Sequence, residues 1–262
     1  MRVLHCLSQR PSLTGSGVTL DALVRHAADA GWSQRVVVGV PSDDPHPVVG
    51  GLPTDRVHPL GFNSSRLPFP VPGMSDVMPY PSTVFAGMRD EQVSAYIEAW
   101  KTHLAEVLSI DRPDDIHSHH VWLMSAVLKD LAPEIPVVTH CHATGLRQMK
   151  LVPRLAERVR TGCGRNDGFA ALHRGHAGEL VDALDVPEEN VHVIGAGFRN
   201  DLFHARGRDP GQSPALLYIG KYSAAKGLPS LLTAFDRLSR ERPGLVLHVA
   251  GDGSGPEAEA LR

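Results

Sequence analysis

The sequence predicts an α/β fold with a doubly wound parallel sheet, because short apolar runs alternate with helical patterns along most of the 262 residues. The chain opens with one such unit: an apolar run at 2–7, then a turn with two glycines, then an amphipathic pattern at 18–30. A linker is expected at 206–214, where glycine and proline cluster and after which the alternation begins afresh. We therefore expect a first domain over 1–205 and an incomplete second domain over 215–262.

Each expected element rests on its hydrophobic period. Strands are placed on short apolar runs, and helices on apolar residues that recur every three or four positions. The expected strands are 2–7, 34–40, 57–60, 115–120, 136–140, 168–172, 191–194, 215–219 and 245–250. The expected helices are 18–30, 91–108, 121–131, 151–160, 175–184 and 228–240, with a last one that begins near Pro256.

The segment 62–90 interrupts this alternation with a run of prolines and glycines. Long segments without regular structure inside a compact domain are usually functional or disordered. Phe62, Phe69, Tyr80 and Phe85 are spread through it, so we expect an ordered loop that packs on the rest of the domain. It is a candidate for contacts with a substrate.

Composition excludes several classes of protein. The net charge is −3 and only 5% of residues are aromatic, so nucleic-acid binding has little support. Three scattered cysteines are too few for a disulfide framework and favour a reduced, cytoplasmic compartment. No apolar stretch is long enough for a membrane span, while peripheral contact with a membrane surface stays open.

A glycine-rich turn follows the first expected strand. Gly15, Ser16 and Gly17 precede the first helix, where glycines let the backbone approach a phosphate or sugar and the helix start favours anions. The pattern lacks the third glycine of a dinucleotide fingerprint, since position 20 is Leu20. A tight strand-to-helix turn without a ligand is the alternative interpretation.

A second candidate loop follows the strand expected at 215–219. Lys221 and Lys226 lie between Gly220 and Gly227, and two ammonium groups that reach one point could neutralise a diphosphate leaving group. The alternative is two lysines on a solvated loop.

Histidines gather at the ends of two expected strands. His117, His119 and His120 end one strand, and His140 and His142 lie at the end of the next. Alternate residues of a strand share a face, so His117 can lie beside His119, and His140 beside His142. A metal needs three or four converging ligands, and we expect polar residues at the carboxyl edge of a sheet rather than a metal site.

Six segments in this order resemble motifs of the large retaining glycosyltransferase family with GT-B architecture, glycosyltransferase family 4. The strand at 115–120 resembles its D-x-x-H-x-H pattern, and 136–145 resembles P-V-V-x-T-x-H-G-T-D. The loop at 220–227 resembles G-R-x-x-x-x-K-G. The other three segments are 14–17, 193–203 and 251–253.

The resemblance implies two Rossmann-like domains and transfer of a sugar from a nucleotide-sugar to an acceptor hydroxyl, with retention at the anomeric carbon. The nucleotide-sugar is a co-substrate, and no cofactor or metal is expected. By this match, His142 is the catalytic histidine near the transferred sugar. The pair Lys221 and Lys226, with Gly220 and Gly227, holds the donor phosphates. By the same match, the residues that contact the sugar or the acceptor are Gly15, Ser16, Gly17, His119 and His120.

The sequence also departs from the family pattern. Lys221 stands where the family has arginine, Gly145 where it has aspartate and Ala196 where it has asparagine. The sequence stops at Arg262, before the family's glutamate motif, so we expect a truncated second domain and impaired transfer. Two alternatives are kept: a non-catalytic or half-enzyme binding module that needs a partner chain, and a metal-dependent hydrolase that uses the histidines from His117 to His142.

Overall fold

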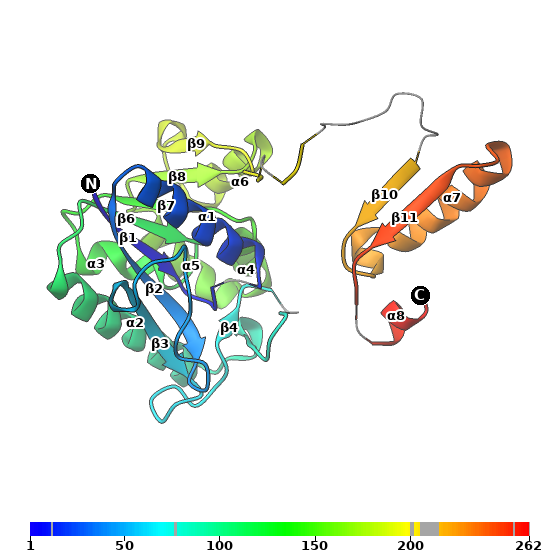
Figure 1. Cartoon of the computed structure of the whole chain (residues 1–262). Helices are drawn as coiled ribbons and strands as arrows, with labels where there is room; N and C mark the ends of the chain where they lie inside the picture. The colour runs from blue at the N-terminus through cyan, green and yellow to red at the C-terminus, as the bar shows by residue number, and fades with distance from the viewer. Residues whose placement is uncertain (12, 76–77, 200–201, 205–214, 254, 262) are drawn as a thin grey trace. The chain divides into compact units, whose positions relative to one another are not determined.

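The computed structural model describes the whole chain except residues 12, 76–77, 200–201, 205–214, 254 and 262 (Figure 1). The chain forms two compact units, 1–197 and 198–262. The linker expected at 206–214 lies outside the described residues. None of the helices in the described part of the chain is long and apolar enough to cross a membrane.

The first unit is built on a parallel sheet of seven strands in the order β3-β2-β1-β6-β7-β8-β9. The chain starts in the middle of this sheet, builds one half outward, and returns to build the other half from β6. The predicted doubly wound parallel sheet is therefore confirmed. Its strands are β1 (Arg2–Leu7), β2 (Ser33–Pro41), β3 (Val57–Phe62), β6 (Asp115–His119), β7 (Val137–His140), β8 (Gly168–Ala171) and β9 (Val191–Val193).

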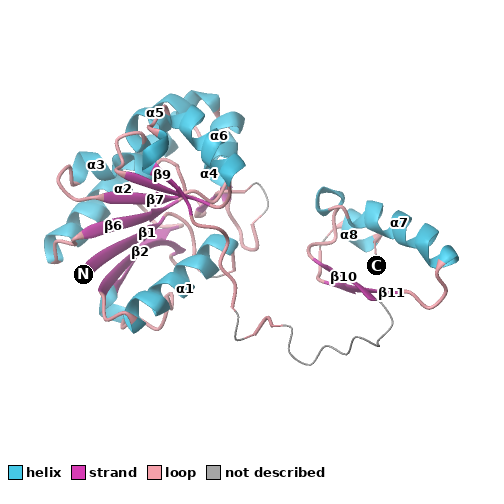
Figure 2. Ribbon diagram, turned by 90° about the horizontal axis from the view of Figure 1, so that it is seen from above, coloured by secondary structure: helices cyan, strands magenta, loops and turns pink. Residues whose placement is uncertain are grey.

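Helices cover the two faces of the sheet, with α1 on one side and α5 on the other (Figure 2). Along β1, Leu4 and Cys6 pack into one apolar cluster, while Leu7 packs into a second cluster with Leu20 of α1. This alternation is what a strand buried on both faces requires. The helices are α1 (Gly15–Asp29), α2 (Asp90–Ile110), α3 (Leu128–Leu131), α4 (Thr144–Leu151), α5 (Pro153–Cys163) and α6 (Arg174–Leu184).

The helix predicted over 121–131 is wrong for most of its length. Only a 3₁₀ turn, Ser125–Val127, and the short α3 are helical there. Residues 121–128 are all buried, so no exposed polar face marks the period of 3.6 residues that would identify a helix. Side chains from farther along the chain bind its carbonyls instead: Cys163 donates to the Trp122 carbonyl at 3.6 Å, and Asn166 to the Ser125 carbonyl at 3.5 Å.

Two further boundaries differ from the prediction. The turn expected at 14–17 is the first turn of α1, which begins at Gly15. The helix expected over 151–160 is α5, and the unpredicted α4 precedes it, with Val152 in a non-helical conformation between the two. A residue before proline is biased away from helical conformation, so Pro153 separates two helices.

The proline-rich segment is ordered where it is described, as predicted. Its strands β4 (Pro72–Gly73) and β5 (Thr83–Val84) pair in parallel, and a 3₁₀ turn, Phe85–Gly87, leads into α2. Phe85 is fully buried and makes an edge-to-face contact with Trp122, with ring centroids 5.3 Å apart. The segment therefore contributes to the core of the first unit.

The second unit is one β-α-β unit with a short helix after it. The strands β10 (Ala215–Ile219) and β11 (Val246–Ala250) pair in parallel around α7 (Leu228–Glu241), and α8 (Pro256–Glu259) follows. A side chain at Gly251 would overlap the carbonyl oxygen of Gly220, so the two strand ends approach closely only because glycine is present.

Candidate functional site

The carboxyl ends of β1 and β6 meet where the strand order reverses, which is where open parallel sheets bind ligands. α1 begins at this edge, capped by Thr14, whose Oγ1 accepts a hydrogen bond from the Gly17 amide at 3.1 Å. A Cβ at Gly15 would meet no atom of the described residues within 4 Å, so these residues leave space beside the first turn. The helix start therefore offers its positive dipole end to a polar or anionic group.

Gln9 is a buried glutamine absent from the predicted site, and it ties this helix start to the proline-rich segment. Its Nε2 donates to Ser16 Oγ at 2.7 Å, and its Oε1 accepts from the Met74 amide at 3.3 Å. Gln148 of α4 donates to the Met74 carbonyl at 3.2 Å. The segment around Met74 is thus bonded both to α1 and to the helix that follows His142.

The predicted histidines gather at the same edge, joined by His5 of β1. Across the strands, His5 is the register partner of His117, and His119 is the partner of His140. The rings of His117 and His119 lie 4.7 Å apart by their centroids, which confirms that alternate residues share a face. His140 and His142 also share a face, with centroids 4.2 Å apart.

Burial lowers the pKa of each of these imidazoles, because the charged form loses its hydration. The pKa of His5 and of His140 falls to about 4, and that of His117 to about 3. The pKa of His119 and of His142 is lowered further, by burial first and then by neighbouring histidines. The rings are therefore neutral near pH 7, and they serve as hydrogen-bond partners or ligands rather than as cations.

His142 lies on a strained turn between β7 and α4. Its Nε2 is 2.9 Å from Nδ1 of His119, and His120 Nδ1 is 2.9 Å from the Thr144 hydroxyl. The φ angles of His120 and Ala143 are 71° and 64°, in the region that favours glycine. The fold thus brings the predicted residues His119, His120 and His142 together, and it holds them with backbone conformations that are costly for side-chain-bearing residues.

Gly145 has a structural reason to be glycine. A side chain there would overlap the carbonyl oxygen of Val121 and lie 3.0 Å from its carbonyl carbon. α4 therefore sits directly against the backbone that follows His120. This close approach accounts for glycine at position 145, where the family motif has aspartate.

The predicted phosphate loop belongs to the second unit. Lys221 and Lys226 are both exposed between β10 and α7, and Tyr218 donates its hydroxyl to the Lys221 carbonyl at 2.7 Å. Gly227 has a φ of 75° and precedes the first turn of α7. A carboxylate also reaches this loop, since Glu257 accepts from the Ala224 amide at 2.7 Å.

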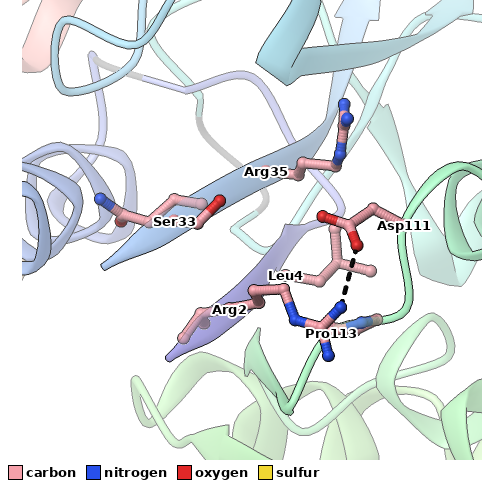
Figure 3. A pocket seen from close by; sticks show the side chains of 8 residues that line it. Arg2, Leu4, Ser33, Arg35, Asp111 and Pro113 are labelled. Atoms are coloured by element: carbon pink, nitrogen blue, oxygen red, sulfur yellow. Dashed lines mark hydrogen bonds and ion pairs between the residues drawn. The ribbon is translucent and has the colours of Figure 1, made fainter. Parts of the chain in front are cut away.

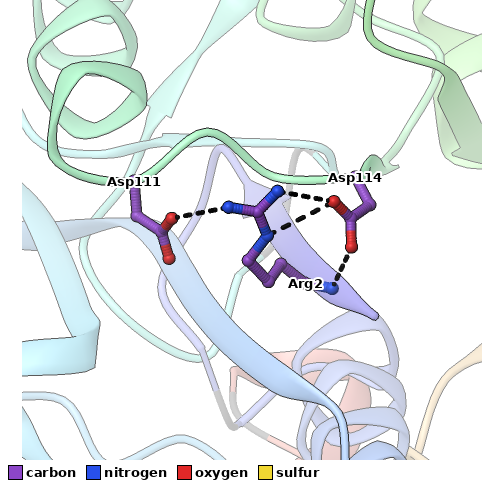
Figure 4. Close-up of polar contacts among 3 residues, drawn as sticks. All are labelled: Arg2, Asp111 and Asp114. Carbon is purple, nitrogen blue, oxygen red and sulfur yellow. Dashed lines mark hydrogen bonds and ion pairs between the residues drawn. The ribbon is translucent and has the colours of Figure 1, made fainter.

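A small pocket lies at the opposite, amino edge of the sheet (Figure 3). Its polar groups bind one another: the Arg2 guanidinium is 2.8 Å from Asp114 and 3.2 Å from Asp111 (Figure 4). Arg35 on its rim donates to the Asp55 carbonyl. These contacts join the start of β1 to the chain before β6, and they leave the carboxyl edge as the candidate site.

Comparison with known proteins identifies the family to which this chain belongs. Residues 14–197 match the glycosyl transferase 4-like domain. The chain belongs to this family. The match covers α1, the proline-rich segment, the histidines from His117 to His142 and the strands β2, β3, β6, β7, β8 and β9.

Known relatives agree with this assignment. The chain is 28% identical over 152 residues to glycogen synthase of Mycobacterium tuberculosis (strain ATCC 25618 / H37Rv), a match that covers 55% of this chain and 36% of that protein. Glycogen synthase of strain CDC 1551 matches equally. The chain thus spans about a third of the length of these relatives.

Solved structures share the fold. Sucrose-phosphate synthase from Thermosynechococcus elongatus has a TM-score of 0.63 at 15% identity, over 100% of this chain and 66% of that one. A lipopolysaccharide outer core galactosyltransferase has a TM-score of 0.59 at 12% identity, over 100% of this chain and 63% of that one. At these identities the likeness establishes the Rossmann-like α/β fold of GT-B proteins.

Proposed function

We propose that this protein is a glycosyltransferase that moves a sugar from a nucleotide-sugar donor to an acceptor hydroxyl, with retention at the anomeric carbon. The observation that carries the proposal is the family match over 14–197, in a chain whose carboxyl edge groups His142, His119 and His120 beside the start of α1. The glycogen synthase relatives favour sugar transfer over the metal-dependent hydrolysis that the histidines alone could suggest.

We assign the contacts with the transferred sugar to His142. Its neutral imidazole would give the sugar hydroxyls a hydrogen-bond partner, and the 2.9 Å contact with His119 would hold the ring orientation. Gly15, Ser16 and the histidines His119 and His120 would line the acceptor side. The Gly17 amide is bonded to Thr14, so the helix-start amides that could bind a ligand are those of Gly15 and Ser16, which have no partner among the described residues.

The donor diphosphate would bind the second unit. Lys221 and Lys226 would neutralise the leaving diphosphate, and Gly220 and Gly227 would let the backbone approach it. With two ammonium groups in this role, the transfer step would need no metal ion. Three free and buried cysteines support a reducing, cytoplasmic location, and peripheral contact with a membrane surface would suit a lipid acceptor.

Donor turnover tests the proposal. The protein as its source produces it would be incubated with UDP-, ADP- and GDP-sugars, and release of nucleoside diphosphate would be followed with and without acceptor. We expect one donor class to be used, and His142→Ala to lower kcat/KM by about 100-fold, the scale of removing one contact to a developing charge. His46→Ala, an exposed histidine of the same unit, is the matched control.

Two results would contradict this assignment. One is an absence of turnover and of saturable binding for all three donor classes. The other is a turnover that His142→Ala leaves at the wild-type rate. Turnover that persists in chelator would support the metal-free transfer step.

A further inference from the structure

We propose that His5, His117 and His119 form a binding site for one transition-metal ion of the zinc class, next to the proposed sugar-transfer site. The three side chains each present a ring nitrogen, and these nitrogens lie within 4.8 Å of one another. This inference goes beyond the proposed function, and it uses His5, which is not among the histidines predicted for this sheet edge.

Strand pairing places the three ligands together. His5 and His117 are register partners on β1 and β6, and His119 follows two positions later on the same face. Nδ1 of His5 and Nδ1 of His117 are 3.2 Å apart. Two nitrogens bound to one tetrahedral zinc at about 2.0–2.1 Å would be separated by roughly 3.3 Å, so these atoms already have the spacing of a ligand pair.

A second layer of contacts orients His5. Gln34 donates its Nε2 to the Val24 carbonyl at 3.0 Å, which leaves its Oε1 as an acceptor. That Oε1 lies 3.0 Å from Nε2 of His5, so this nitrogen carries the proton and Nδ1 presents its lone pair toward His117. Metal-bound histidines are held in this way, by donating their other N–H to an oxygen.

His119 supplies the third nitrogen. Its Nδ1 contacts His142, and its Nε2 is buried without a hydrogen-bond partner among the described residues. Buried polar atoms are almost always satisfied, so an unpaired ring nitrogen beside two others calls for a partner. The His119 side chain is fully buried and His5 is 3% exposed, so the site would hold the ion away from bulk water.

Ring orientation favours this trio over its neighbour. His119, His140 and His142 also bring three nitrogens within 4.8 Å, but their rings are stacked, with interplanar angles of 12–28°. Lone pairs of imidazole lie in the ring plane, so stacked rings direct them within nearly parallel planes that do not meet at one point. The ring of His117 is inclined by 78° to His5 and by 54° to His119, which lets the lone pairs converge on one point.

The donor set selects the metal. Three neutral imidazoles with no carboxylate suit Zn²⁺, Co²⁺, Ni²⁺ or Cu²⁺, whereas Mg²⁺ and Ca²⁺ require oxygen ligands. A bound ion would link β1 to β6 where the strand order reverses. His142 stays outside the coordination shell, so its proposed contact with the sugar does not depend on the metal.

Cobalt titration tests the site without an activity readout, so its failure and the failure of the transferase proposal are distinguishable. Metal-free protein would be titrated with Co²⁺, and visible d–d absorption would report four-coordinate binding. We expect one equivalent, displaced by Zn²⁺, and a rise in Tm on Zn²⁺ addition. His5→Gln and His117→Gln should each weaken Co²⁺ binding by at least tenfold, and Gln34→Leu by about tenfold through lost orientation of His5.

His140→Gln is the matched control and should retain the cobalt spectrum. Trp fluorescence would verify that each variant is folded, and His117→Gln, at a half-buried position, covers the case in which His5→Gln fails to fold. The proposal would be overturned by the absence of a saturable cobalt spectrum. It would also be overturned if His140→Gln abolished binding while His5→Gln kept it.

Discussion

The close approach of α4 to the chain after His120 makes Gly145→Ala a sensitive test of the site's architecture. The added methyl would overlap the Val121 carbonyl oxygen. The methyl is fixed directly to the helix backbone and the oxygen is a backbone atom, so neither can turn away as a flexible side chain would. Overpacking of this kind costs about 3 kcal/mol, at the upper end of its usual range. Alanine in a helix returns about 0.5–1 kcal/mol relative to glycine, so the net loss is about 2 kcal/mol.

Urea unfolding followed by Trp fluorescence measures this loss. All three tryptophans lie in the first unit, and Trp122 is buried next to the site of overlap. With an m-value of about 2 kcal/mol/M, the midpoint should fall by about 1 M. Gly178→Ala is the matched control, because Gly178 is exposed within α6 and a Cβ there would meet no atom within 4 Å. This control should raise stability by about 0.5–1 kcal/mol.

The two variants carry the same chemical change, but Gly145→Ala is expected to lower the free energy of unfolding and Gly178→Ala to raise it. A midpoint for Gly145→Ala at or above that of the wild-type protein would refute the close packing of α4 against Val121. A loss of stability in Gly178→Ala would show that the difference does not arise from local packing.

Four further predictions follow from single contacts. Ala143→Gly should raise the free energy of unfolding by up to about 1 kcal/mol, because it relieves a φ of 64°; a lower urea midpoint would contradict this strain. Gln9→Ala should cost about 1–3 kcal/mol by leaving buried partners unpaired, and should speed proteolysis of the proline-rich segment; unchanged cleavage would disprove that the glutamine secures it. Lys226→Ala should weaken nucleoside diphosphate binding by about tenfold in calorimetric titration, and equal affinity would remove it from the phosphate site. Burial raises the pKa of Cys141 to about 12, so a thiol reagent at pH 8 should label it only after unfolding, and fast labelling of the native protein would argue against its burial.

Much of the fold could be predicted because the strands of a parallel sheet are buried on both faces. Runs such as Val36–Val38 are apolar at every position, which marks a strand without reference to its partners. The segment 121–128 is also buried throughout and apolar except for Ser125, yet the helix predicted from it is mostly absent. Its carbonyls are bonded to Cys163 and Asn166, side chains 41 residues away, and no local pattern records such partners.

The candidate site likewise contains some residues that could be predicted from the sequence and others that could not. His119 and His142 could be predicted as neighbours, because the carboxyl ends of adjacent parallel strands meet at one edge. His5 and Gln9 could not, since their partners are 112 and 65 residues distant in sequence. His5 needs the strand order to place it beside His117, and Gln9 needs the path of the proline-rich segment. The strained φ of Ala143 is likewise visible only in three dimensions.

An NMR time course of a nucleotide-sugar with the protein and an acceptor would test the proposed transfer directly. We expect the anomeric signal of the donor to be lost as a new glycosidic signal of the same anomeric configuration appears, and His142→Ala to slow both changes together. A product of inverted configuration would contradict retention. Release of free sugar or phosphate with no glycosidic product, at the same rate in the variant, would contradict the proposed transfer itself.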